Sequence, residues 1–333
     1  MSTLRYGRLA DVVVRELAEI KPGENVLVIA DTGTPDGLAE AYLNAAIVGK
    51  AKAVLVIEAE RILTDLELPA SLAGAIREAD VILGLCSGIF SRSEACIAAR
   101  ERGARILLTD PRGMEQYLID GIVNVDTATM LHNTALLEEL IHKGENARIT
   151  SDNGTDLTMS LAGRPAVTSD GRVVGPGEMD YYPGTQVSFA GVEDTINGKV
   201  VIDGSVSTLG VVTQPFTIVM ENGKAIGYEG DGLDLDRYKQ HIAEQNDPLL
   251  AWACHWSFGL NPRAKVSGNI YEDERYFGCL DIGWGSQDPS FGGTLGLSPH
   301  HVDVVVLHPK LVIDDVVVLE NNRYNTELGF INP

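Results

Sequence analysis

Basic residues are scarce in this chain of 333 residues, which has 26 Lys and Arg against 47 Asp and Glu. The formal net charge is therefore −21, and such a protein should repel nucleic acid and anionic membranes. We exclude both as partners. The sequence also has no apolar run of about 20 residues, the length that spans a bilayer, so we predict no membrane segment.

Cysteine is rare as well. The four cysteines show no C-x-x-C spacing, which predicts reduced thiols in a cytoplasmic protein. The N-terminus has charges within its apolar pattern and no signal-type apolar core. Nucleotide motifs are missing too, because VLVIADTGTPDG runs from strand to loop to helix without G-x-G-x-x-G or a P-loop lysine. Nucleotide binding is thus disfavoured.

The first part of the chain, residues 1–146, alternates apolar runs of strand length with helical patterns. Such continuous apolar strands are typical of a parallel sheet covered on both faces. We predict an α/β domain with a doubly wound, mostly parallel sheet. Its strands are expected at 25–31, 51–59, 81–88 and 105–111, and its principal helices at 4–20, 71–78, 91–103 and 130–147.

The hydrophobic pattern of the sequence changes after Gly144, where short runs of alternating polar and apolar residues are separated by turn pairs. Hairpins are predicted at Asn153-Gly154, Asp170-Gly171, Asn197-Gly198 and Asn222-Gly223. One amphipathic helix is expected at 234–245. Residues 147–333 should therefore form a second domain, a largely antiparallel α+β domain that carries the metal and the catalysis.

Candidate metal ligands occur in two segments of this second domain. His301 and Asp303 are two residues apart at the start of a predicted strand, so they should project from the same face. His255 lies in the apolar run LLAWACHWSFGLNP. Two histidines and one carboxylate form the set that holds non-heme Fe(II) with positions left open. A single histidine in an apolar run is, however, also typical of a hydrogen-bonded core residue. The His-x-Asp spacing often arises by chance.

Other polar and aromatic residues are weaker candidates. Glu178, in a turn-rich segment, is the candidate for proton transfer, although a loop carboxylate is commonly only solvated. Cys254 should face away from His255 on a strand, toward the core. Ser87-Gly88 follows a parallel strand, where open sheets bind ligands. Aromatic residues cluster around the ligand candidates as core or as the wall of a pocket for a flat ring: Trp252, Trp256, Phe258, Trp284 and Phe291.

Several short motifs resemble the second domain of the thermophilic leucyl-aminopeptidase metallopeptidases. They are SDNGTDLTMSL, VEDTINGKVVIDGS, FGLNP and HHVDVVV, in residues 151–161, 192–205, 258–262 and 300–306. Those peptidases use two metal ions bridged by carboxylates. Here Gln186 and His255 stand where the peptidases place metal-binding glutamates, and only the His301 and Asp303 pair is retained.

The resulting set is similar to that of the 2,5-dihydroxypyridine 5,6-dioxygenases, relatives of these peptidases. The resemblance implies that His255, His301 and Asp303 bind one Fe(II). It also implies that the enzyme opens a hydroxylated pyridine ring with O₂, in an extradiol-type reaction of pyridine degradation. The family further implies a homo-oligomer. The alternatives are an aminopeptidase-like metallo-hydrolase using zinc or manganese, which needs further carboxylates near the metal, and a metal-free binding protein with structural histidines.

Overall fold

The computed structural model describes residues 5–60, 68–86, 90–91 and 93–333. The predicted loop residues Ser87 and Gly88 lie outside the described residues. The chain divides into two compact units. Unit 1 comprises Met1–Val125 and Ser169–Gly184, and unit 2 comprises Asp126–Thr168 and Thr185–Pro333.

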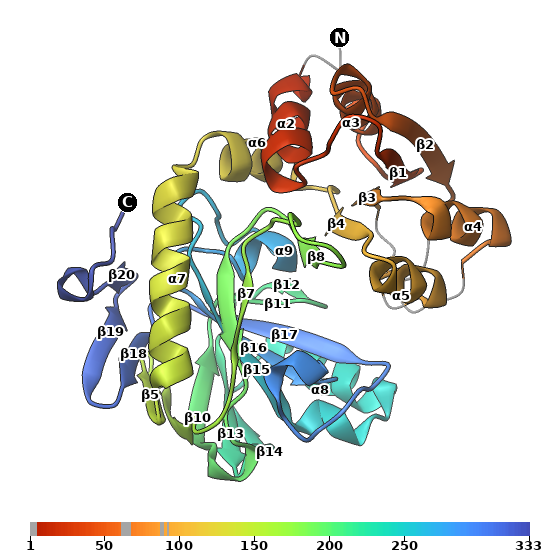
Figure 1. Ribbon diagram of the computed structural model, residues 1–333. Helices are drawn as coiled ribbons and strands as arrows, with labels where there is room; N and C mark the ends of the chain where they lie inside the picture. The colour runs from red at the N-terminus through yellow and green to blue at the C-terminus, as the bar shows by residue number, and fades with distance from the viewer. Residues whose placement is uncertain (1–4, 61–67, 87–89, 92) are drawn as a thin grey trace. The chain divides into compact units, whose positions relative to one another are not determined.

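Unit 1 contains a five-stranded parallel sheet in the order β2-β1-β3-β4-β8 (Figure 1). Its strands are β1 (Asn25–Asp31), β2 (Lys52–Glu58), β3 (Val81–Leu85), β4 (Arg105–Thr109) and β8 (Met179–Tyr181). Its helices are α2 (Gly7–Val12), η1 (Val13–Leu17), α3 (Leu38–Val48), α4 (Ala70–Glu78), α5 (Glu94–Glu101) and α6 (Glu115–Val123). Leu27, Ile29 and Ile82 share one core cluster with apolar residues of α4 and α5. The predicted α/β class is confirmed.

Unit 2 contains two sheets. The first has the order β14-β13-β10-β6-β5-β18-β19-β20, and the second has the order β12-β11-β17-β16-β15-β9-β7. The first sheet consists of β5 (Asn146–Thr150), β6 (Asp156–Ser160), β10 (Asn197–Ile202), β13 (Phe216–Glu221), β14 (Lys224–Glu229), β18 (Lys310–Ile313), β19 (Val316–Glu320) and β20 (Arg323–Tyr324).

The second sheet carries the candidate ligands. It consists of β7 (Ala166–Ser169), β9 (Gln186–Phe189), β11 (Ser205–Val206), β12 (Gly210–Val211), β15 (Ala253–Gly259), β16 (Leu280–Gly285) and β17 (His301–Val306). Strands β9, β15, β16 and β17 are joined by antiparallel pairings. One apolar core cluster includes side chains from both sheets, so the predicted antiparallel α+β class is confirmed as well.

The helices of unit 2 are α7 (Thr127–Lys143), α8 (Leu233–Gln245) and α9 (Ile270–Asp273). Short helical turns η2 to η5 span Glu193–Thr195, Pro248–Ala251, Pro289–Phe291 and Thr326–Leu328. Among the described residues, no helix combines the length and apolar character needed to cross a membrane.

The division between the units differs from the predicted boundary at residue 146 in two places. Helix α7 belongs to unit 2, because Leu137 and Ile141 are part of that unit's core. The segment 169–184 returns to unit 1, where β8 pairs in parallel with β4. Unit 1 is therefore built from two separate stretches of the chain.

The turn pairs behave differently from one another. Asn222-Gly223 joins β13 to β14 with positive φ angles at both residues, as a tight hairpin requires. Asn197-Gly198 is not a turn and begins strand β10. Gly198 is needed there because a Cβ atom would collide with the backbone oxygen of Asp156 on the neighbouring strand β6.

Candidate metal centre

Three adjacent strands of unit 2 present one apolar and one polar face. Trp256 on β15, Ile282 on β16 and Val304 on β17 lie in register and join the apolar core. Side chains alternate between the faces of a strand. The opposite face therefore carries the intervening residues, which are His255 and Ser257 from β15, Asp281 and Gly283 from β16, and His301 and Asp303 from β17.

The structure brings each of the two predicted histidines close to Asp303. The Nε2 atom of His301 lies 2.8 Å from Oδ1 of Asp303, and the Nε2 atom of His255 lies 3.7 Å from the same oxygen. His255 is almost fully buried, while His301 and Asp303 are partly accessible. His300 faces elsewhere, with Nδ1 3.0 Å from Oδ2 of Asp247.

A second carboxylate, which the sequence reasoning missed, lies in the same cluster. Oδ2 of Asp281 is 3.2 Å from Nε2 of His255. Donor atoms of His255, Asp281 and Asp303 all lie within 4.8 Å of one another. Asp281 is fully buried, and within the part of the chain that the structure describes its Oδ1 has no hydrogen-bond partner. A buried carboxylate oxygen without a partner is costly, so this side chain fits a cation.

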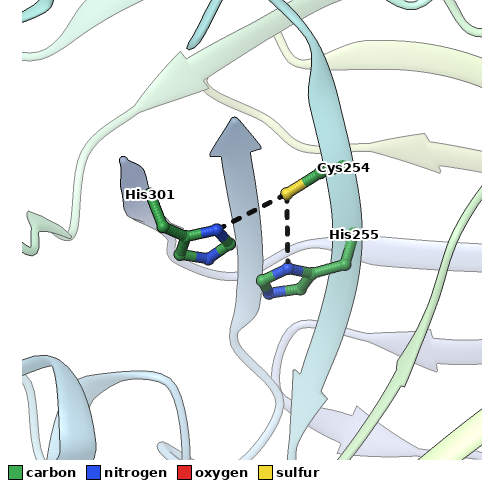
Figure 2. Close-up of side chains that lie close together, drawn as sticks. All are labelled: Cys254, His255 and His301. Atoms are coloured by element: carbon green, nitrogen blue, oxygen red, sulfur yellow. Dashed lines mark hydrogen bonds between the residues drawn. The ribbon is translucent and has the colours of Figure 1, made fainter. Parts of the chain in front are cut away.

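The Nδ1 atoms of both imidazoles face away from the carboxylates and contact Cys254. Figure 2 shows Cys254 with its sulfur between them, 3.7 Å from Nδ1 of His255 and from Nδ1 of His301. Nδ1 of His301 also donates to the carbonyl of Ser286 at 3.0 Å. An N–H held by a carbonyl fixes the tautomer and leaves the other nitrogen for a metal. Nε2 is thus the atom that each ring directs at a carboxylate. On the Nδ1 side, Cys254 and the two histidines form a second group of possible metal ligands.

The position of Cys254 corrects the expectation that its side chain faces the core. The pairing of β15 with β16 shifts register between Ala253 and His255. A β-bulge at this point re-aims the extra residue, so Cys254 and His255 turn to the same side. The single sequence contains no bulge signal here, because Cys254 is an ordinary small apolar residue by type.

Gly283 lies between the two histidines and makes room for them. It is in register with His255 on one side and with Asp303 on the other. A Cβ atom at this position would collide with the His255 ring and lie 2.9 Å from Cε1 of His301. Glycine is therefore required for two imidazoles to approach across the central strand.

A loop after β16 carries an aromatic ring that stacks on His255. The ring of Phe291 is stacked on His255 with centroids 5.4 Å apart. Gln287 holds the loop, because its Nε2 donates to the carbonyl of Cys254 at 2.8 Å and its Oε1 accepts from the backbone of Leu295 at 3.0 Å. Of the predicted aromatic cluster, Trp256, Phe258 and Trp284 are core, whereas Phe291 contacts the candidate ligands.

The charges of the cluster are strongly coupled. Burial and the nearby Asp303 raise the pKa of Asp281 to about 6. Burial also opposes ionisation of Asp303, but His301 lowers the pKa of that carboxyl overall. Burial would lower the pKa of His255, yet the bonds to Asp281 and Cys254 raise it to about 10. Two adjacent buried carboxylates form a concentration of negative charge that a divalent cation would neutralise.

Glu178 lies in unit 1, whereas the predicted ligands lie in unit 2. Its Oε2 accepts from the backbone N–H groups of Val174 and Gly175, each at 2.7 Å. These bonds brace the loop that precedes β8. The proton-transfer role of Glu178 stays a prediction.

The model of the 2,5-dihydroxypyridine 5,6-dioxygenase family matches residues 11–325. The chain belongs to this family. The predicted resemblance is thereby confirmed.

One curated protein and one solved structure, both from Pseudomonas putida, are similar to this chain. The Pseudomonas putida protein named 2,5-dihydroxypyridine 5,6-dioxygenase is 26% identical over 197 residues, which cover 55% of this chain and 55% of that protein. This alignment therefore spans little more than half the length of the curated relative. A solved structure of the Pseudomonas putida dioxygenase matches with a TM-score of 0.81 and 19% identity over 98% of both chains.

A second solved structure that resembles this chain is AmpT from Thermus thermophilus. It matches with a TM-score of 0.67 and 15% identity, covering 97% of this chain and all of AmpT. At such low identities the two structural likenesses show the shared fold alone. The ligand set of this chain has to be argued from its own residues.

Proposed function

We propose that this chain is a dioxygenase that opens a hydroxylated pyridine ring with O₂, and that His255, His301 and Asp303 hold one Fe(II). The observation that carries the proposal is the convergence of these side chains on one face of β15 and β17. Two imidazoles and a carboxylate suit Fe(II) and leave positions for other molecules. The family to which the chain belongs supports the ring-opening chemistry.

When bound, Fe(II) supplies adjacent positions at which a ring hydroxyl and O₂ can be held side by side and O₂ can be activated. The chain's own residues prepare this site. Ser286 fixes the tautomer of His301 through Nδ1. Phe291 covers one face of His255, which keeps water from that ring and offers an apolar wall next to the centre. Gln287 holds the loop that carries Phe291.

Peptide hydrolysis by a two-metal centre is not favoured, although Asp281 adds a second carboxylate to the cluster. That chemistry needs carboxylates at the positions of Gln186 and His255. Gln186 is an amide whose Nε2 donates to Oε2 of Glu274 at 3.3 Å. Glu193, which could have supplied a carboxylate, is instead paired with the guanidinium of Arg164 in a buried ion pair.

The proposal also includes the assembly and location of the protein, a cytoplasmic homo-oligomer that acts on a small aromatic substrate. Light scattering on the purified protein would measure the subunit number. A mass equal to that of the single chain at micromolar concentration would contradict the oligomer.

The test of function is anaerobic reconstitution of chelator-stripped protein with Fe(II), followed by O₂ uptake with 2,5-dihydroxypyridine. We expect about one Fe(II) per chain and O₂ consumption that matches loss of the ring's absorbance. His255→Ala, His301→Ala and Asp303→Ala should each lose iron and activity, whereas His142→Ala, at the exposed end of α7, should retain both. Full activity with zinc, or hydrolysis of leucyl-p-nitroanilide without ring opening, would overturn the proposal.

A further inference from the structure

Asp281 is the one carboxylate of the described cluster that the 2-His-1-carboxylate set leaves without a role. It lies on β16, the central strand of the three, and is fully buried. Its Oδ2 points to His255, and its Oδ1 has no partner among the residues that the structure describes. A structural carboxylate at this depth would be expected to accept bonds with both oxygens.

A carboxylate that only orients a metal-bound histidine bonds to the nitrogen that faces away from the metal. Asp281 does not have this geometry. It faces Nε2 of His255 at 3.2 Å, while Nδ1 of the same ring faces Cys254. The nitrogen beside Asp281 is therefore the one directed at Asp303, 3.7 Å away, where a cation shared by the two residues would lie.

The separations between the donor atoms support the same conclusion. Two ligands at about 2.1 Å from one ion, at right angles to each other, are separated by about 3 Å. The pairs formed by His255 with Asp281, His255 with Asp303, and His301 with Asp303 are separated by 3.2, 3.7 and 2.8 Å. All three values are close to the separation of neighbouring ligands.

We propose that Asp281 is a fourth protein ligand, so that the centre consists of two histidines and two carboxylates. This inference rests on the proposed function, since it concerns the same metal. Two ionised carboxylates would balance the charge of a divalent cation within a buried site. The metal-free protein, in contrast, would hold two adjacent buried carboxylates with the histidines and the buried Arg275 as the cations that act on Asp303.

The test compares Asp281→Asn with wild type by titrating the metal-free full-length protein with Fe(II), and separately with Co(II). Asparagine keeps the size and one oxygen but removes the charge. We expect Fe(II) affinity to fall by about tenfold or more, with a changed Co(II) absorption spectrum. Asp273→Asn is the matched control, because Asp273 is another fully buried carboxylate of unit 2 that bonds instead to Ser267 and Gly268. The control should bind both metals like wild type.

Wild-type affinity and an unchanged Co(II) spectrum in Asp281→Asn would overturn the inference while leaving the proposed function intact. If wild type itself binds no divalent cation, both fail together. If Asp281→Asn does not fold, Asp281→Glu gives the answer, because moving the carboxylate by one methylene should alter the Co(II) spectrum of a protein that still binds metal. A Co(II) spectrum identical to that of wild type in Asp281→Glu would again overturn it.

Discussion

The imidazole rings of His255 and His301 lie almost parallel across Gly283, with centroids 5.2 Å apart and planes 6° apart. Phe291 is also stacked on His255, with centroids 5.4 Å apart. The orientation of both candidate ligands thus depends on a residue without a side chain in the strand between them.

Gly283→Ala should disrupt this arrangement. The added methyl group would collide with the His255 ring and crowd His301, and forcing extra volume into a packed site costs about 1–3 kcal/mol. We expect Fe(II) affinity to fall by about 5- to 150-fold, the change that this energy produces if it distorts the arrangement of the ligands. Gly227→Ala on β14, where a Cβ meets nothing within 4 Å, is the control. Equal metal affinities in the two variants, measured by titration, would contradict the role of Gly283.

Phe291→Ala should make the bound metal easier to remove. The stack on His255 is worth about 0.5–1.5 kcal/mol, and its loss would also admit water to the ring. We expect Fe(II) to be lost to a chelator about 2- to 10-fold faster, as measured by stopped-flow absorbance. Leu297→Ala, at an exposed position of the same loop, should lose iron at the wild-type rate. A slower or unchanged rate in Phe291→Ala would show that the ring does not protect the centre.

Glu178→Gln distinguishes a loop brace from a proton-transfer group. Glutamine keeps an oxygen that can accept from Val174 and Gly175, but it cannot take up a proton near neutral pH. From these bonds we expect kcat for ring opening to stay within about twofold of wild type. A loss of kcat by about 100-fold with a changed pH profile, in a protein with an unchanged melting temperature, would instead establish Glu178 as the proton-transfer residue.

The stability of the protein should depend on pH through Asp180. Burial raises the pKa of this carboxyl from about 3.8 to about 6, against the bonds that it accepts from Ser169 and Gly171. The folded state therefore binds the proton more tightly than the unfolded state. The resulting stabilisation is complete below pH 3.8 and is lost as pH rises toward 6.

Asp180→Asn has no such titration. The difference in unfolding free energy between wild type and Asp180→Asn should therefore decrease from pH 4.5 to pH 6.5, as measured by urea unfolding. Asp156→Asn, which removes an exposed carboxylate paired with Arg148, should not reproduce this decrease because the pKa of Asp156 is lowered. A difference that grows with pH in Asp180→Asn would contradict the assignment.

Much of the site could be predicted from sequence, because the strand rule places residues i and i+2 on one face. It predicted the pairing of His301 with Asp303 and, together with the family resemblance, the approach of His255. The same rule could have located Asp281, since LDIGWG places an acidic residue two positions before Gly283 within a buried run. It was missed because a strand of this apolar composition is read as core.

Two other features of the fold, the bulge at Cys254 and the strand β8, could not be predicted from the sequence around them. The bulge that turns Cys254 toward the histidines depends on how β15 pairs with β16. The return of the chain to unit 1 depends on β8, which is only three residues long and has the sequence Met-Asp-Tyr. Both are determined by pairing with strands distant in sequence, which periodicity within a short window does not report.

Because side chains alternate along β15, β16 and β17, the residues that form the apolar core lie on one face and the candidate metal ligands lie on the other. The apolar side is committed to Trp256, Ile282 and their neighbours, whereas the opposite side tolerates histidine, aspartate, serine and glycine. The candidate metal ligands therefore project from the face of the sheet that does not carry the apolar core. A change of ligand on that face leaves the side chains that pack between the sheets unchanged.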